Sequence, residues 1–152
     1  MKILFVCTGN TCRSPMALTL ARKIFAEAGL CPDGLTSAGL AAAYGHPASQ
    51  GAQIAVAACG LDLSGHTSQP LTPELVAEST LILTMTQAHK QAICYRFPEA
   101  TSKTHLLTEY IGHQGDIPDP YGQTQQIYTT CYTHLYQIIQ KIPNTNLAPE
   151  SI

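Results

Sequence analysis

Short apolar segments alternate along the chain with longer segments of helical spacing, and this alternation restricts the fold more than any other feature. The first segment, ILFV at residues 3–6, is typical of a strand covered on both faces of a sheet. Because strands that alternate with helices form right-handed βαβ units, the sequence predicts an α/β domain with helices on both faces of a parallel sheet. Strands are expected at residues 3–6, 34–38, 81–83 and 103–106, and helices at residues 15–28, 47–59, 86–97 and 127–142, with another after the Thr72-Pro73 N-cap.

Two of these helices carry apolar stripes that predict which side chains face the core. Cys59 ends the inward stripe of the helix at residues 47–59. The last helix has a stripe that begins at Ile127 and continues through Cys131, Leu135, Ile138 and Ile142. Most cysteines of the chain are expected to be buried as small hydrophobic side chains.

The length and charge of the chain limit its organisation and its partners. Residues 1–142 of the 152 are expected to form one domain, followed by a loose tail at residues 143–152. A formal net charge of −2 argues against a nucleic-acid surface, and no apolar segment reaches the roughly 20 residues of a membrane span. Residues 1–7 lack the features of a signal peptide. We therefore expect a cytoplasmic protein with reduced cysteines and no metal or other cofactor.

The loop between the first strand and the first helix has the composition of an anion site. In an open α/β sheet the ligand lies beyond the carboxyl ends of the strands, where this loop is placed. Its backbone N–H groups, together with the N-terminus of the helix, favour a bound phosphate or another oxyanion. The residues expected to bind it are Thr8, Gly9, Asn10, Thr11, Cys12, Arg13 and Ser14.

Two residues of this segment predict covalent chemistry as well as binding. The planar guanidinium of Arg13 can bind two oxygens of a phosphate. Cys7, at the end of the strand, is expected to be a thiolate near neutral pH, because an arginine and a helix N-terminus lie beside it. A thiolate below a bound phosphate is an activated nucleophile, and Cys7-x5-Arg13 followed by Ser14 is the spacing that this chemistry requires.

The two loop cysteines have other interpretations. Cys7 and Cys12 could bind zinc, but no second Cys/His pair at a suitable spacing accompanies them. A nucleotide site would need G-x-G-x-x-G or the Walker lysine, which the loop lacks. A redox site that uses thiols alone is a further alternative. Cys12 could form a protective disulfide with an oxidised Cys7, or it could be only a small side chain that fits, and the sequence leaves both open.

The segment VCTGNTCRSPMA resembles the phosphate-binding loop of the low molecular weight protein phosphatases. A second segment, GDIPDPYG, resembles the D-P-Y/F loop of that family, and shorter matches lie at residues 37–39, 63–66 and 83–85. The resemblance covers residues 1–142. It implies a flavodoxin-like three-layer sandwich with a four-stranded parallel sheet in the order 2-1-3-4.

The resemblance also implies roles for individual residues. The nucleophile of the family corresponds to Cys7, its phosphate-binding arginine to Arg13, and its general acid to Asp119. Asp116 is the competing carboxylate, but the family motif D-P-aromatic favours Asp119. Further implied residues brace the loop, namely Asn10, Ser14, Ser37 and His66, or form the walls of the cleft, namely Tyr44 and Tyr121.

Thr11 is the loop residue that bears most on the choice between substrates. Tyrosine phosphatases of the family usually have a bulky aliphatic residue here, whereas a threonine hydroxyl suits a polar guanidinium. The loop, together with LTPEL, MTQAHK and TEYIGHQGDIPDP, is most similar to the bacterial protein arginine phosphatases. We therefore expect phosphoarginine in proteins as the substrate. Tyr121, where arginine phosphatases often have phenylalanine, keeps a tyrosine phosphatase as the alternative.

Two further functions compete with a phosphatase. Thioredoxin-coupled arsenate reductases share the fold and the loop, but they need two closely spaced downstream cysteines, and Cys94 stands alone. A silent phosphate-recognition module would not need both a nucleophile and an acid, which Cys7 and Asp119 supply. Both are therefore disfavoured.

Overall fold

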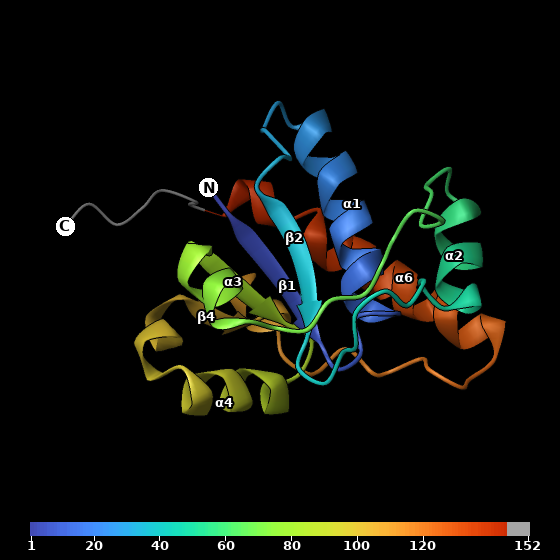
Figure 1. The fold of residues 1–152 in the computed structure, drawn as a ribbon. Coiled ribbons are helices and arrows are strands. Elements are labelled where there is room, and N and C mark those ends of the chain that lie inside the picture. Colours follow the sequence, from blue (N-terminus) through green and yellow to red (C-terminus); the bar gives the residue numbers. More distant parts are fainter. Residues whose placement is uncertain (146–152) are drawn as a thin grey trace.

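The computed structural model describes residues 1–145, and a parallel sheet of four strands lies at its centre (Figure 1). The strands are β1 (Ile3–Cys7), β2 (Leu35–Gly39), β3 (Leu81–Thr84) and β4 (Thr104–Leu106). Their order across the sheet is β2-β1-β3-β4, and each neighbouring pair is parallel. The predicted fold class and strand order are confirmed.

The predicted helices are present, with boundaries that differ by a few residues, and the structure adds a short helix after β4 that the sequence did not predict. The helices are α1 (Arg13–Glu27), α2 (Gln50–Ala57), α3 (Pro73–Glu78), α4 (Gln87–Arg96), α5 (Leu107–Tyr110) and α6 (Gln125–Ile139), with 3-10 helices at Pro98–Lys103 and Ile142–Asn144. Side-chain oxygens of Ser49, Thr72, Thr86 and Thr124 accept backbone N–H groups at the starts of α2, α3, α4 and α6. These caps satisfy helix N–H groups that have no partner inside the helix.

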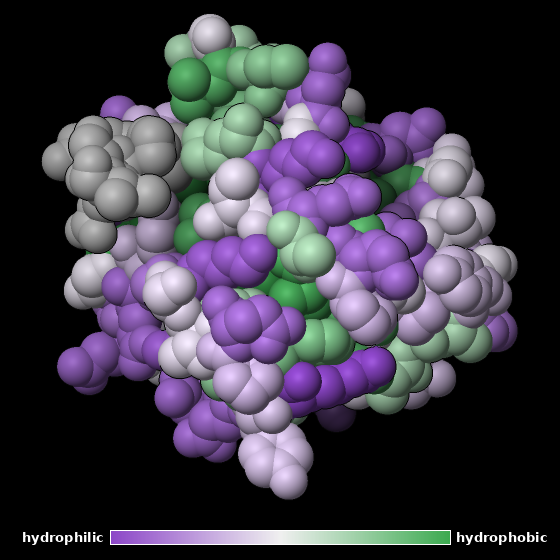
Figure 2. Space-filling view, turned by 60° about the vertical axis from the view of Figure 1, so that its left-hand side comes forward, coloured by the Kyte–Doolittle hydropathy of each residue, from purple (hydrophilic) through white to green (hydrophobic). Residues whose placement is uncertain are grey.

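Alternate residues of β1 build the two hydrophobic layers. Ile3 and Phe5 face the layer of α1, α2 and α6, whereas Leu4 and Val6 face the layer of α3 and α4. All four side chains are fully buried, as the unbroken apolar run predicts. Figure 2 shows the side of α3 and α4, where a mainly hydrophilic surface leaves some hydrophobic residues visible at its centre. No helix within residues 1–145 has the length and apolar character of a membrane span.

The structure corrects three of the burial predictions. Helix α2 ends at Ala57, so Cys59 lies in the following turn and is exposed instead of facing the core. Ile127 is 42% exposed because it lies in the first turn of α6 and the first inward positions of that helix are Tyr128 and Cys131. Half of the cysteines are buried, not most of them: Cys7, Cys12 and Cys131 are buried, Cys94 is intermediate, and Cys31 and Cys59 are exposed.

The predicted loose tail at residues 143–152 lies mostly outside the described residues. Pro143 and Asn144 belong to the second 3-10 helix, and residues 146–152 are not described.

The carboxyl end of β1 is where the fold opens a place for a ligand. The next strand along the chain, β2, pairs with one edge of β1, and β3 pairs with the other. The chain therefore leaves the carboxyl end of β1 at a switch point of the sheet, where α/β folds bind their ligands. The first residues after β2 hold this end in place: the Leu40 N–H donates to Cys7 O at 3.0 Å, and the Ala41 N–H donates to Thr8 O at 2.9 Å.

Candidate active site

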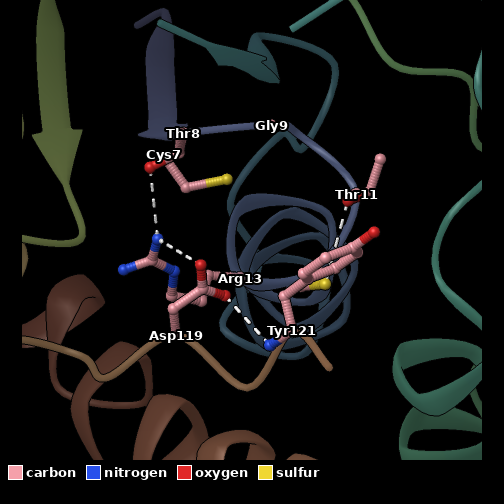
Figure 3. Close-up of a pocket in the computed structure, with 8 residues that line it drawn as sticks. Cys7, Thr8, Gly9, Thr11, Arg13, Asp119 and Tyr121 are labelled. Carbon is pink, nitrogen blue, oxygen red and sulfur yellow. Dashed lines mark hydrogen bonds and ion pairs between the residues drawn. The ribbon is translucent and has the colours of Figure 1, made fainter. Parts of the chain in front are cut away.

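A small pocket of about 180 Å³ opens beside the loop between β1 and α1 (Figure 3). Helix α1 begins at Arg13, and no side chain caps its first N–H groups, which leaves them for an anion. In Figure 3 the Cys7 sulfur points into the space between this loop and the segment with Asp119. The lining residues are Cys7, Thr8, Gly9, Thr11, Cys12, Arg13, Asp119 and Tyr121.

The Cys7 thiol has a hydroxyl donor beside it. Its Sγ lies 2.9 Å from the Oγ of Ser14, and both side chains are buried. Ser14 Oγ also accepts a hydrogen bond from Asn10 Nδ2 at 2.8 Å. That contact uses one lone pair of the serine oxygen, and the serine keeps a proton that can donate to the sulfur.

Asn10 is the centre of the contacts that hold the loop in shape. Within residues 1–145 it is the only non-glycine residue with a positive φ, at 54°, and it is fully buried. Its Nδ2 donates to Ser37 Oγ at 2.9 Å as well as to Ser14. Its Oδ1 accepts from the backbone N–H of Gln69 at 3.0 Å, and its carbonyl lies 2.7 Å from His66 Nε2. These bonds stabilise a backbone conformation that would otherwise be strained.

His66 and Gln69 reach the loop from a distant segment. Burial lowers the pKa of His66, so a neutral imidazole is favoured; because Asn10 O can only accept, Nε2 carries the proton and donates. Gln69 Nε2 also donates to Ser37 O at 2.9 Å. The structure thus brings together all four predicted bracing residues, and it adds Gln69, which no local motif indicated.

The guanidinium of Arg13 lies between the loop and the segment with Asp119. Nη1 donates to Ile117 O at 3.0 Å, and Nη2 donates to Thr8 Oγ1 at 3.4 Å. Nη2 also lies 3.5 Å from Asp119 Oδ2. Nε is buried without any partner, although buried N–H donors are nearly always paired. An anion in the pocket would satisfy it.

The structure distinguishes the two carboxylates that are candidates for the general acid. Asp119 lines the pocket with a half-exposed side chain, and its Oδ1 accepts the Tyr121 N–H at 3.1 Å. Asp116 does not line the pocket; its Oδ1 accepts the N–H of Gln87, the first residue of α4, at 2.9 Å. Asp116 therefore stabilises a helix N-terminus, which leaves Asp119 as the carboxylate that can reach a bound substrate.

The outer wall of the pocket is formed by Thr11 and Tyr121. Figure 3 shows both on the side away from Arg13, and Tyr121 is 70% exposed. Tyr44 was also expected in the wall, but the structure does not bring it there: it is 70% exposed and does not line the pocket. Tyr44 lies in the long connection that follows β2, where the sequence has no periodic pattern to fix a direction.

Cys12 lines the pocket beside Cys7 and has polar partners of its own. Its Sγ lies 3.1 Å from Ser49 Oγ and 3.6 Å from the hydroxyl of Tyr128. Burial raises the pKa of Tyr128, so its hydroxyl stays protonated. Both cysteines are free thiols. Sequence reasoning missed Ser49 and Tyr128, which come from the starts of α2 and α6.

Comparison with known proteins agrees with this geometry. The family described as low molecular weight phosphotyrosine protein phosphatase matches residues 2–150. The chain belongs to this family. The protein-arginine-phosphatase of Geobacillus stearothermophilus is 39% identical to it over 142 residues, which are 93% of each chain. The low molecular weight protein-tyrosine-phosphatase PtpB of Staphylococcus epidermidis is 35% identical, over 93% of this chain and 96% of its own.

A solved structure matches the fold over almost its whole length. It is a C7S mutant of the arginine phosphatase YwlE with a phosphorylated active-site serine. The TM-score is 0.89 and the sequence identity 37%, covering 95% of this chain and 94% of the other. The fold and the family are therefore the expected ones.

Proposed function

We propose that this member of the family hydrolyses phosphorylated protein side chains through a cysteinyl-phosphate intermediate. Cys7 Sγ attacks phosphorus, the bond from phosphorus to the substrate side chain breaks, and Asp119 donates a proton to the leaving atom. Water then attacks the Cys7–phosphate, Asp119 takes back a proton, and inorganic phosphate leaves with Cys7 restored as a thiolate. The observation that supports these roles is one pocket lined by a thiol, a guanidinium and a half-exposed carboxylate.

Phosphate binding is assigned to the loop of residues 8–14. Arg13 can bind the anion with its unpaired Nε and its charged, planar guanidinium, and α1 adds its uncapped N-terminus. Inorganic phosphate or a similar oxyanion is therefore the expected ligand of the loop when no substrate is bound. The steps above are complete with these groups, so the proposed mechanism calls for no cofactor.

For the substrate we propose phosphoarginine in proteins. Thr11 lines the pocket with a short side chain and a hydroxyl, whose Oγ1 lies 3.8 Å from Cys12 Sγ. A guanidinium has several N–H donors that need acceptors, and Asp119 and the Thr11 hydroxyl supply them at the leaving-group side. The relative named as a protein-arginine-phosphatase supports this choice. Tyrosine phosphatase remains the second candidate, because a relative at 35% identity has that name.

The choice is tested by kcat/KM on phosphoarginine and phosphotyrosine peptides with the wild type and with Thr11→Ile. The wild type should prefer phosphoarginine. Isoleucine removes the hydroxyl and widens the apolar wall, so the ratio should move towards phosphotyrosine by about tenfold, as for the loss of one polar contact. If the wild type prefers phosphotyrosine and Thr11→Ile does not change the ratio of the two kcat/KM values, the protein is a tyrosine phosphatase. If neither peptide is hydrolysed, the proposed activity is wrong.

Two further assignments remain proposals. Cys12 is proposed to form a disulfide with oxidised Cys7, supported by the position of both thiols in one pocket. The cytoplasm is proposed as the compartment, since a nucleophilic thiol needs reducing surroundings.

A further inference from the structure

A buried histidine outside the predicted site contacts the phosphate loop. His89, in the first turn of α4, is 7% exposed, and its Nε2 lies 2.9 Å from Thr8 Oγ1. The other ring nitrogen, Nδ1, is buried without a partner. The roles proposed above do not explain why a helix on the opposite face of the sheet places an imidazole here.

The surroundings of His89 decide its protonation. Burial and the nearby Arg13 charge lower its pKa to about 4, although Asp116 and Asp119 act in the opposite direction, so the ring is neutral at pH 7. A neutral imidazole has one N–H. Buried N–H groups are almost always paired, so the proton is placed on Nε2, which has a partner, and not on Nδ1, which has none. Nε2–H therefore donates to Thr8 Oγ1.

This donation fixes the direction of the Thr8 hydroxyl. A hydroxyl oxygen has two lone pairs and one proton. Arg13 Nη2, which can only donate, uses one lone pair at 3.4 Å, and His89 Nε2–H uses the other at 2.9 Å. The Thr8 proton is thus left to donate elsewhere, and Thr8 lines the pocket (Figure 3).

We propose that the Thr8 hydroxyl is a hydrogen-bond donor to the bound phosphate, and that His89 is the positioning residue that aims it. This inference rests on the proposed function, because it adds a contact to the same phosphate. Arg13 and Thr8 then act together, one with charge and the other with a directed neutral donor. The contact also ties α4 to the phosphate loop, whereas the bond of Gln87 to Asp116 ties α4 to the segment with Asp119.

The test is the affinity for inorganic phosphate, measured by isothermal titration calorimetry at pH 7. Thr8→Val keeps the shape but removes the hydroxyl, and it should weaken binding about tenfold, as for one hydrogen bond to a charged group. His89→Leu frees the hydroxyl to turn away and should weaken binding by a similar factor. The double variant should be no weaker than Thr8→Val alone, since His89 acts only through the hydroxyl. His89→Gln, which retains an N–H donor on a chain of similar reach, should restore most of the affinity.

Three results would overturn the proposal. The first is independent losses that multiply in the double variant, which would indicate a general structural role for His89. The second is a proton on Nδ1 instead of Nε2 in the ¹⁵N NMR spectrum of the unmodified protein, a measurement that needs no folded variant. The third is a wild type without measurable phosphate binding. The phosphatase assignment is judged separately, because peptide turnover, and not phosphate affinity, decides it.

Discussion

The two segments that face each other across the pocket are held very differently. The phosphate loop is fixed from within, since Asn10 is fully buried and its side chain and carbonyl bind Ser14, Ser37, His66 and Gln69. The segment with Asp119 is anchored mainly at its start, where Ile117 N–H donates to Met85 O at 2.8 Å and Asp116 caps α4.

Beyond Ile117 the segment with Asp119, the acid segment, is held by fewer contacts. Asp119 is half-exposed and Tyr121 is 70% exposed, and the hydrogen bond between them lies within the segment itself. The difference matches the two tasks proposed for these segments. A phosphate is always the same tetrahedral anion, so the loop that binds it can be rigid, and donors that are already in place stabilise the anion most. In the proposed mechanism the acid must reach leaving groups carried by different proteins, which a less constrained segment permits.

The largest effect should come from the rigid side of the pocket. Cys7→Ser is expected to abolish turnover, because a serine hydroxyl in the same place is ionised far less than a thiol. Phosphate binding should persist, since Arg13 and the loop backbone are unchanged. Turnover and phosphate affinity are measured together, with Cys31→Ser, an exposed cysteine, as the control. Substantial residual kcat in Cys7→Ser would contradict the cysteinyl-phosphate mechanism.

Oxidation should give an equally complete but reversible loss. Mild peroxide is expected to inactivate the enzyme by oxidising Cys7, and Cys12 should then form the disulfide that thiol reduces. Mass spectrometry of the oxidised protein identifies the product. Cys7 found as sulfinic acid with Cys12 free would refute the protective role of Cys12.

A smaller loss is expected on the less constrained side. Asp119→Ala should lower kcat by about 10²–10⁴-fold, the usual contribution of a general acid. The loss should shrink for a substrate with a good leaving group, which needs little protonation. Asp116→Ala is the matched variant, and it should mainly destabilise α4, because Asp116 Oδ1 accepts the Gln87 N–H. The opposite pattern in the two variants would make Asp116 the acid.

The smallest effect is on stability, and it measures the contrast between the two segments directly. Asn10→Ala should lower the free energy of unfolding by about 2–3 kcal/mol, because it leaves buried partners unpaired at a positive φ. Tyr121→Ala, in the exposed part of the acid segment, should change it by less than about 0.5 kcal/mol. Urea unfolding of both variants gives the comparison. Equal losses would mean that the acid segment is as firmly held as the loop.

The sequence by itself predicted what depends on neighbours along the chain. The strand, the loop and the start of the helix around Cys7 and Arg13 lie within a few residues of one another, so their order already brings thiol, guanidinium and backbone donors together. The parallel sheet followed from alternating apolar patterns, and the caps at Thr72 and Thr86 followed from local side-chain chemistry. Asp119 was indicated by the D-P-aromatic motif.

Only the tertiary structure decided which distant side chains meet that loop. Gln69, His89 and Tyr128 contact it across 59, 81 and 116 positions of sequence. No local pattern indicates such contacts, because a polar residue on a helix or a loop has the same sequence signature whether it faces water or a partner. The same reason explains why Ile127, Cys59 and Tyr44 were misplaced. A periodic stripe predicts a face of an element, but the packing of the other elements determines where that face is covered and where it ends.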